Sequence, residues 1–572
     1  MATGQSTKKS GTGKPSATDH QEIEWQFDVD DLESVEGWLG QHSSGSSGLV
    51  VTPESTVEIT DTYYDTDNWR FYRAGYALRV RKKDGEVEAT MKSLAPAEDG
   101  LRRRREISEP LKDDRPATLK KARGPVGKRS RALLGERETR PLFRMQTRRQ
   151  RFALESSADG DAEDVRIGEI SLDTSEVAIG EGEEPKRLKR VEVEVDKDPS
   201  PALHGFVDEM QFALDLTPAT ISKYETGLYA SGLDPDEGNE LGPTEVAPSM
   251  SVGEVAFAVL RRQFAEMRNH EPGTRLGEDP EELHDMRVPT RRMRAAMKVF
   301  QEALPERASW LREELRWVAH ALGNVRDLDV QIERFQAWKE DADEESSEFL
   351  ERILKITEKR RAEARTAMLD VLDSRRYESL ESSFADMLRR GPGAEHEIVQ
   401  SNGHDPSREP ITAAAPPLVS RRFRKWRKAA KRLDATSSPE DFHDVRKKGK
   451  RLRYTLEFVS EVYGKPVQKL VKPLKALQDD LGDHQDAIVA SGYLRELGTT
   501  TGGTRVPRGA AFTMGVYSER CAREAADLRS RVPDSKPFRA LTKGKGWKRF
   551  EKVLEETRKS RNATDTQSDS VR

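Results

Sequence analysis

The chain has 572 residues, of which 35% are charged, and its formal net charge is only −4. Two or three domains are expected at this length, because single cores rarely grow beyond about 250–300 residues. Since the whole chain has no basic excess, any basic surface must come from local segregation of charge. The single cysteine, Cys521, excludes an intramolecular disulfide framework and a cysteine-based zinc site.

The two ends of the chain have the composition of disordered tails. Residues 1–19 contain no apolar segment of the kind found in signal peptides, and residues 556–572 are equally polar. No apolar run approaches the roughly 18 residues that a membrane-spanning helix needs. These features predict a cytoplasmic protein that does not bind membranes.

Residues 20–230 show the period of two that is typical of β-strands. EIEWQFDV, YALRVRKK, EVEATMKS, RRQRFAL, VRIGEISLD and RVEVEVD alternate in this way, and Gly, Asp and Pro mark turns between them. A basic helical segment interrupts this region at 116–136. Residues 231–249 are rich in Gly, Pro and acid and predict a linker.

From residue 250 to about 555 the hydrophobic pattern is helical. A second linker, at about 391–417, divides this region into one part of about 250–390 and another of about 418–555. The predicted fold class is therefore α+β multidomain, with a β-rich domain followed by an all-α domain of two parts.

The helical half contains an internal repeat. HDMRVPTRRMR begins at His284 and HDVRKKGKRLR begins at His443, and both carry basic residues three, seven and ten positions after the histidine. The related lines LGNVRDLDV and LGDHQDAIV each begin 38 residues after their histidine. Two elements that keep one register over this length indicate a true duplication.

Spacings of three and four place these basic residues on one face of each helix. The alternative is an ordinary solvated face, but such a face normally mixes acidic with basic residues. Here the charges are nearly all of one sign and recur in both copies, which favours an anion-binding face. Two such faces brought together would form a groove for a multivalent anion.

These repeated lines resemble the CHAD domain, the conserved histidine α-helical domain, over residues 250–555. The resemblance implies two pseudo-repeated helical bundles that bind inorganic polyphosphate. Carried over by motif, it implies these polyphosphate-binding residues: His284, Arg287, Arg291, Arg294, Arg326, His443, Arg446, Lys450 and Arg453, with Arg262, Arg422 and Lys447 as weaker additions.

Two positions depart from this pattern. Pro289 falls where a helix former is usual, so we expect the helix to begin near it or to hold it in its first turn. Gln485 stands opposite Arg326, and the adjacent His484 is a candidate to compensate for the missing charge.

The strands of the β region carry charges in pairs. Acid-x-acid occurs at Glu22 and Glu24, base-x-base occurs at Arg79 and Arg81, and RRRRE follows at 102–106. Any single pair could face solvent, but repetition on several strands, with aliphatic residues between, predicts a barrel with a charged lumen and an apolar outer side. Carboxylates facing Arg and Lys suit a metal–triphosphate complex.

With YYDTDNWRFYRAGYALRVR and ISKYETG, this region resembles the CYTH domain of the triphosphate tunnel metalloenzymes, over residues 20–230. The resemblance implies an eight-stranded antiparallel tunnel and Mg²⁺ or Mn²⁺ as cofactor. It implies as catalytic residues Glu22, Glu24, Lys92, Arg79 and Arg81; as metal ligands Glu22, Glu24, Asp173, Glu192 and Glu194; and as substrate-binding residues Arg79, Arg81, Lys92, Arg104, Arg149 and Lys223, with Glu106 in the same tunnel. Arg148 is an alternative to Arg149, and Arg103 and Arg105 are alternatives to Arg104.

One departure concerns the N-terminal motif, which is Glu-x-Glu-x-Lys in the family and ends in Gln26 here. A glutamine can donate a hydrogen bond but carries no charge. The family's KGP turn is also replaced by MKS. These departures leave two hypotheses open, an enzyme of reduced activity and a domain that only binds.

The resulting functional prediction is a polyphosphate-handling protein that hydrolyses inorganic triphosphate or polyphosphate ends with a divalent metal and binds polyphosphate through its helical domain. The alternative is a non-enzymatic polyphosphate-binding or targeting protein. Nucleic acid is not favoured as a partner, because the basic faces lack interleaved aromatic residues. Cyclisation of ATP and hydrolysis of thiamine triphosphate remain alternative activities for the tunnel. An association with polyphosphate granules is compatible with the predicted function. The sequence leaves the oligomeric state open.

Overall fold

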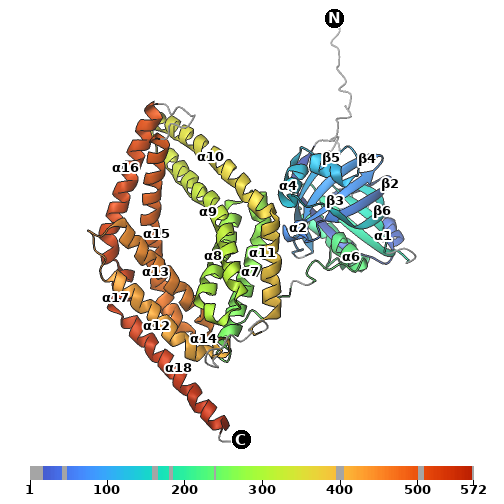
Figure 1. The fold of residues 1–572 in the computed structure, drawn as a ribbon. Coiled ribbons are helices and arrows are strands. Elements are labelled where there is room, and N and C mark those ends of the chain that lie inside the picture. Colours follow the sequence, from blue (N-terminus) through green and yellow to red (C-terminus); the bar gives the residue numbers. More distant parts are fainter. Residues whose placement is uncertain are drawn as a thin grey trace. The chain divides into compact units, whose positions relative to one another are not determined.

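The structure is a computed structural model that describes residues 17–41, 48–98, 100–156, 165–179, 184–237, 240–393, 405–499 and 508–569. The chain divides into two compact units, with the boundary between Glu237 and Gly238. The first unit is rich in strands and the second is helical (Figure 1). Among the helices of the described ranges, none is both long and apolar enough to cross a membrane.

A ring of eight antiparallel strands forms the first unit. The sheet runs in the order β5-β4-β3-β2-β6-β7-β8-β1-β9, and β1 also pairs with β5, which closes the ring. The strands are β1 (Thr18–Asp28), β2 (Leu49–Asp65), β3 (Tyr76–Lys83), β4 (Glu86–Ser93), β5 (Leu101–Leu111), β6 (Arg140–Ser156), β7 (Val165–Val177), β8 (Lys186–Val195) and the short β9 (Thr217–Pro218). The predicted antiparallel barrel is confirmed.

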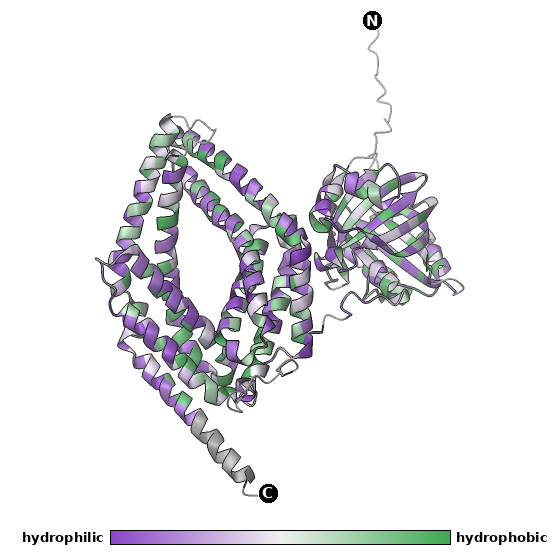
Figure 2. Cartoon of the chain, viewed as in Figure 1, coloured by the Kyte–Doolittle hydropathy of each residue, from purple (hydrophilic) through white to green (hydrophobic). Residues whose placement is uncertain are grey.

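Side chains alternate between the two faces of each strand because the β period is two. Ile23, Trp25 and Phe27 of β1 join a core on the outer side of the barrel, together with the valines of β8. Figure 2 shows this alternation as purple and green along the strands. The residues between them, including Glu22 and Glu24, therefore face the lumen.

Short helices accompany the barrel. They are α1 (Leu32–Gln41), α2 (Arg70–Arg73), α3 (Pro116–Lys121), α4 (Pro125–Leu134), α5 (Pro201–Ala213) and α6 (Lys223–Ala230). Helices α1 and α5 contribute Val35, Leu39 and Phe206 to the outer core. Helices α3 and α4 are the basic helical segment expected at 116–136.

The second unit contains two successive sets of helices. The first set is α7 (Val252–Leu276), α8 (Pro280–Val299), α9 (Arg307–Glu340), α10 (Glu344–Asp373) and α11 (Arg375–Arg390); the second is α12 (Ile411–Ala430), α13 (Pro439–Phe458), α14 (Ser460–Tyr463), α15 (Lys465–Thr499), α16 (Arg508–Arg531), α17 (Lys536–Lys543) and α18 (Lys545–Asp569). Short 3₁₀ turns are η1 (Gln301–Ala303), η2 (Pro406–Arg408) and η3 (Val532–Asp534). The predicted all-helical second region is confirmed.

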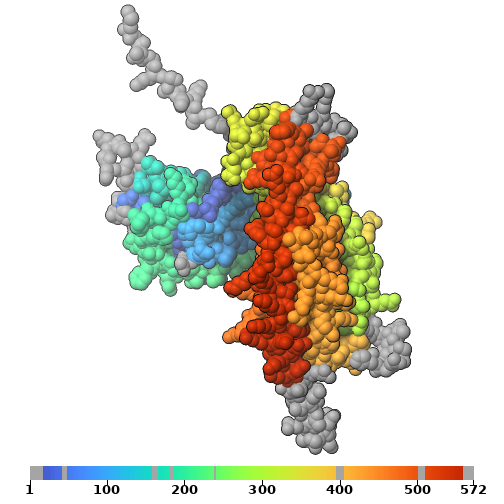
Figure 3. All heavy atoms as spheres, turned by 90° about the vertical axis from the view of Figure 1, so that its left-hand side faces the viewer, coloured from blue at the N-terminus to red at the C-terminus, as the bar shows by residue number. Residues whose placement is uncertain are grey.

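The two sets share one apolar core. Helix α8 packs against α13, and Met286 and Met293 of α8 lie in the same cluster as Val445 and Leu452 of α13. Helix α18 packs against α12, where Trp547 stacks on Phe423 with ring centroids 4.0 Å apart. Figure 3 shows this C-terminal segment in red beside α12 in orange. The duplicated helices therefore form one body.

Pro289 does not mark a helix start, contrary to expectation. Helix α8 begins at Pro280, where the Asp279 side chain accepts a hydrogen bond from the backbone N–H of Glu281, and Pro289 lies inside the helix. A proline there removes one backbone hydrogen bond. Pro289 is buried in the contact surface of α8, so packing holds the helix through it. His284 and Arg287 consequently lie in the same continuous helix as Arg291.

The expected tails and linkers are shorter in the structure. Strand β1 already begins at Thr18, helix α12 begins at Ile411 within the expected linker, and α18 continues to Asp569. Residues 1–16 and 570–572 lie outside the described ranges, as do residues 394–404 of the expected linker.

Candidate functional site

A cavity inside the barrel collects most of the charged residues singled out in the sequence. It is lined by Glu22, Gln26, Tyr63, Ala77, Arg79, Arg81, Lys92, Ser93, Leu94, Arg104, Glu106, Arg149, Glu192, Glu194, Ser222, Lys223 and Tyr224. Glu24 and Asp173 are outside this lining but form ion pairs with lining residues. The closed ring thus brings together side chains from both ends of the domain sequence.

The structure distinguishes the neighbouring arginines that the sequence left open. Arg104 is buried in the lumen, whereas Arg103 and Arg105 are exposed and pair with Asp198 and Asp19 outside it. Because alternate residues face opposite sides, Arg149 lines the cavity while Arg148 is exposed.

One cluster surrounds Lys92 of β4. The Lys92 ammonium forms an ion pair with Glu22 and lies 3.3 Å from Glu24 and 3.7 Å from Glu106. Burial favours the neutral amine, but the carboxylates of Glu22 and Glu106 outweigh it and raise the pKa of Lys92. Arg104 pairs with Glu24 in the same cluster. Lys92 therefore remains charged inside the barrel.

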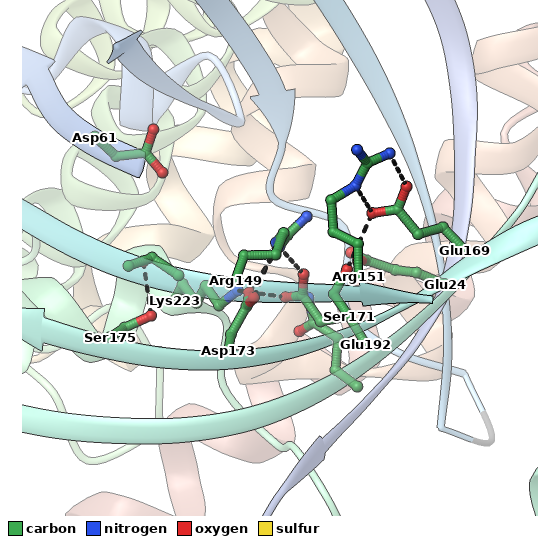
Figure 4. A network of polar contacts seen from close by, with 12 residues as sticks. Glu24, Asp61, Arg149, Arg151, Glu169, Ser171, Asp173, Ser175, Glu192 and Lys223 are labelled. Atoms are coloured by element: carbon green, nitrogen blue, oxygen red, sulfur yellow. Dashed lines mark hydrogen bonds and ion pairs between the residues drawn. The ribbon is translucent and has the colours of Figure 1, made fainter. Parts of the chain in front are cut away.

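A second cluster joins β6, β7, β8 and the start of α6 (Figure 4). The Arg149 guanidinium donates to Asp173 at 2.9 and 2.7 Å and to Glu192 at 2.6 Å. Lys223 contacts Asp173 and lies 2.9 Å from Glu192. Burial opposes ionisation of Glu192, but Lys223 and Arg149 outweigh it and hold the pKa of Glu192 well below its usual range.

Lys223 owes its position to the N-terminus of α6. Ser222 caps this helix, and its side chain and that of Glu225 exchange hydrogen bonds with each other's backbone N–H groups. Lys223 is the first residue after this cap, so the fixed start of α6 holds its side chain at the cavity. The capped N-terminus of α6 thereby positions Lys223, a cation of the cavity that does not come from a strand.

Asp61 is a residue of this site that sequence analysis missed. It is buried in β2 and accepts two hydrogen bonds from the Arg81 guanidinium, at 2.8 and 2.9 Å, while Arg79 lies 3.9 Å away. Although burial opposes ionisation, Arg81 and Arg79 lower the pKa of Asp61. In the sequence VEITDTYYD, Asp61 is two residues from Ile59 and two from Tyr63, so the three lie on one strand face, and both neighbours are buried. This spacing could have indicated that Asp61 is buried as well.

The five predicted metal ligands do not assemble into one ligand cluster. In the described part of the chain, no group of three or more His, Cys, Asp or Glu side chains is arranged to hold a metal ion. Protein cations hold Asp173, Glu192, Glu24 and Glu22 instead. These four carboxylates would have to exchange partners before they could bind a metal.

Glu194 differs from the other carboxylates. No cationic side chain of the described residues forms an ion pair with it, and burial, followed by repulsion from Glu22, raises its pKa to about 7. A hard divalent cation takes carboxylate oxygens as ligands. Buried carboxylates that repel one another lose this repulsion when such a cation binds. Of the predicted set, Glu194 therefore fits a divalent cation best, and Glu22, which repels it, is the neighbour that would share such a cation once it released Lys92.

Gln26 joins the second cluster as a neutral donor. Its Nε2 donates to Glu192 Oε1 at 3.0 Å, and its side chain lines the cavity. Since Lys223 and Arg149 already neutralise Glu192, the glutamine does not leave Glu192 unpaired. The cavity has one positive charge fewer than it would have with the family's lysine at this position.

In the helical unit, basic residues of both repeats converge around Lys450. Burial, followed by repulsion from Arg446 of the same helix and from Arg291 and Arg287 of α8, lowers the pKa of Lys450 to about 7, and Arg453 acts in the same direction. These side chains come from α8 and α13, which pack together. Basic side chains of the two repeats thus lie near one another, and we call these five residues the Lys450 cluster.

The remaining predicted residues of this unit lie around that cluster. Arg326 pairs with Glu281 and Glu333 at 3.3 Å each; its charge, after burial, lowers the pKa of His284. The Arg294 guanidinium is partly buried, and burial followed by repulsion from Arg316 of α9 lowers its pKa.

The histidine of the second repeat, His443, has a different neighbour from His284. His443 Nδ1 lies 2.7 Å from Gln485 Oε1, so a neutral amide contacts this histidine. His484 does not restore the missing charge, because burial lowers its pKa to about 4 and its ring packs on Phe442.

The three weaker additions lie outside the Lys450 cluster. Arg262 pairs with Glu461 at 2.7 Å in an exposed position. Burial, followed by repulsion from Arg421 and Arg451, lowers the pKa of Arg422 to about 10. Lys447 is exposed on α13.

Comparisons with known proteins match both halves of the chain. The CYTH domain model matches residues 20–228 and the CHAD domain model matches residues 258–495. Uncharacterized proteins from two strains of Mycobacterium tuberculosis are each 25% identical over 505 residues, which cover 84% of this chain and 89% of theirs.

Solved structures align with each half separately. The CHAD domain from the plant Ricinus communis is 24% identical, with a TM-score of 0.42, and the match covers 51% of this chain and 95% of that one. A Hippeastrum protein described as having a dominant triphosphatase activity is 17% identical, with a TM-score of 0.27, and the match covers 38% of this chain and 99% of that one.

Proposed function

We propose that this chain, in which a CYTH domain at residues 20–228 is followed by a CHAD domain at 258–495, hydrolyses inorganic triphosphate or polyphosphate ends in its barrel and binds polyphosphate through its helical domain. The observation that supports hydrolysis is one cavity in which cations from six positions meet the carboxylates of Glu22, Glu192 and Glu194. The cations are Arg79, Arg81, Lys92, Arg104, Arg149 and Lys223.

The cavity can exchange its internal ion pairs for contacts to phosphate. Guanidinium groups bind phosphate oxygens through paired hydrogen bonds, as they now bind carboxylates, so Arg81 and Arg149 can turn from Asp61 and Asp173 to a triphosphate. In the reaction, a water oxygen forms a bond to the terminal phosphorus while the bond between that phosphorus and the bridging oxygen breaks. The lining cations stabilise the negative charge that collects on that leaving oxygen.

Glu194 and Glu22 are the residues of this cavity that would hold Mg²⁺ or Mn²⁺, and Glu22 would exchange its contact with Lys92 for the metal. When bound, such an ion neutralises phosphate charge and polarises phosphorus–oxygen bonds. The protein's own contribution is to keep both carboxylates beside the phosphate-binding cations.

Phosphate release from tripolyphosphate tests the catalytic proposal. We expect release by the full chain with Mg²⁺ or Mn²⁺, and a loss of 100-fold or more, on the order seen when groups acting on a transition state are removed, for Glu22→Gln combined with Glu194→Gln. Glu176→Gln, on an exposed part of β7, is the matched control. Turnover that needs no metal, or that survives the double substitution, would contradict hydrolysis at this site.

A binding-only barrel is the second candidate, and the neutral Gln26 is the observation that favours it. This candidate predicts salt-dependent binding of tripolyphosphate without phosphate release. Comparing the wild type with Gln26→Lys in one substrate screen separates the two. Turnover found only in the variant would support a barrel that has lost catalysis.

Binding by the helical domain is tested separately. Combining Arg291→Ala with Lys450→Ala removes two charges from the Lys450 cluster, so binding of long polyphosphate should weaken and the slope of log K against log salt should become shallower. Unchanged binding would refute the assignment to this cluster.

A further inference from the structure

The hydroxyl group of Tyr454 is buried where the basic faces of the two repeats meet. Tyr454 belongs to α13 and is only 4% exposed. Its hydroxyl oxygen is buried and has no hydrogen-bond partner in the part of the chain that the structure describes. A buried polar group left unsatisfied costs about 1–3 kcal/mol. An oxygen or nitrogen atom placed beside this hydroxyl would complete its hydrogen bonding.

Cations surround this tyrosine on several sides. The guanidinium carbons of Arg291 and Arg292 lie 5.9 Å from its ring centroid, and that of Arg453 lies 4.8 Å away. Cation–π attraction favours such positions over the ring face. Arg287 of α8 and Arg446 of α13 also lie close enough to Tyr454 for a negative charge on its oxygen to raise their pKa values. The tyrosine therefore lies among basic side chains of both helices.

The hydroxyl is unique to one copy of the repeat. Tyr454 comes 11 residues after His443, and the position 11 residues after His284 is Ala295. Ala295 packs against the apolar core. The duplication thus supplies cations from both copies but a phenol from one.

We propose that the Tyr454 hydroxyl donates a hydrogen bond to an oxygen of a polyphosphate chain held by Arg287 and Arg446, which makes Tyr454 a neutral binding residue of the groove. This inference rests on the proposed binding of polyphosphate by the helical domain. It adds a residue that the repeated charge pattern does not contain.

A neutral donor suits this position for an electrostatic reason. Burial, followed by repulsion from the arginines of the Lys450 cluster, already lowers the pKa of Lys450 to about 7. A further cation would increase that repulsion in the free protein, whereas a hydroxyl adds a hydrogen bond to the anion without adding charge.

Tyr454→Phe tests the proposal against Tyr463→Phe. Tyr463 is likewise buried with an unpartnered hydroxyl, but its pKa is raised by burial alone, with no charged group involved. Binding of polyphosphate of defined length to the full chain is measured by calorimetry at several salt concentrations. We expect about 10- to 100-fold weaker binding for Tyr454→Phe and wild-type binding for Tyr463→Phe.

The salt dependence separates a hydroxyl contact from an indirect effect. Tyr454→Phe removes no charge, so its slope of log K against log salt should equal that of the wild type, whereas Arg291→Gln should make the slope shallower. Affinity of Tyr454→Phe within twofold of the wild type would overturn the proposal. So would a changed slope, or a melting temperature well below that of Tyr463→Phe. A wild type that does not bind polyphosphate would instead refute the proposed function.

Discussion

Polyphosphate binding to the helical domain should depend on pH through Lys450. Its amine has a pKa of about 7 in the free protein because burial and the neighbouring guanidiniums of Arg446, Arg291, Arg287 and Arg453 disfavour its charged form. A bound polyanion favours the charged form and so raises this pKa. Binding must then be coupled to proton uptake by Lys450.

The size of the effect follows from the free-state pKa. With a pKa of about 7, roughly nine-tenths of the amine is protonated at pH 6 and roughly one-tenth at pH 8. Affinity is therefore full below pH 7 and falls about tenfold between pH 6 and pH 8, which corresponds to about 1.4 kcal/mol. At pH 7 about half a proton should be taken up for each site filled.

Calorimetry in two buffers of different ionisation enthalpy measures this uptake directly, and Lys450→Arg is the matched control. Arginine keeps the charge at every accessible pH, so the variant retains any pH dependence that comes from histidines or from the terminal phosphates of the ligand. The difference between the wild type and the variant isolates Lys450. Equal loss of affinity in the two proteins between pH 6 and pH 8, or equal proton uptake at pH 7, would refute the reasoning.

Three further substitutions separate structural from functional charges. Asp61→Asn removes the carboxylate shared by the guanidiniums of Arg79 and Arg81. Breaking such a buried pair costs about 3–5 kcal/mol, so thermal unfolding should show a loss of stability. Tripolyphosphate should partly restore that stability. Lys223→Gln should lower kcat/KM for tripolyphosphate about 10- to 100-fold, while the exposed Lys186→Gln should not, and an equal loss in both would contradict a specific role. Arg275→Gln breaks a buried ion pair with Glu271, 2.7 Å away in the helical unit. Denaturant unfolding should show that the free energy of unfolding falls by about 3–5 kcal/mol. A weaker affinity of the folded variant for polyphosphate would contradict a purely structural role.

Local sequence patterns were sufficient to predict the strands, the charged lumen and the duplicated basic helices. In β1 and β8, alternation alone assigns Glu22, Glu24, Glu192 and Glu194 to one face, because successive side chains of a strand point to opposite sides. In α8 and α13, spacings of three and four place the basic residues on one face for the same kind of reason. Both inferences need only the periodicity of a single element.

The pairing of charges could not be predicted in this way, because it depends on which strands become neighbours. Gln26 donates to Glu192 from 166 positions away, and Lys223 reaches Asp173 across 50. Pairing of β1 with β8 places Gln26 opposite Glu192, and pairing of β6 with β7 places Arg149 opposite Asp173. Closure between β1 and β5 brings Arg104 to Glu24. Protein cations thereby hold four of the five expected metal ligands. Asp61 was missed for the same reason.

In the helical domain, tertiary packing decided two further points. Pro289 lies inside a continuous α8 because the apolar residues around it are buried in the shared core; proline chemistry alone predicts a helix start. The sequence by itself determined that each repeat carries a basic face. Only the packing of α8 against α13 determined that the two faces meet at Lys450, because the position of one helix against another depends on the shape of a core to which distant segments contribute.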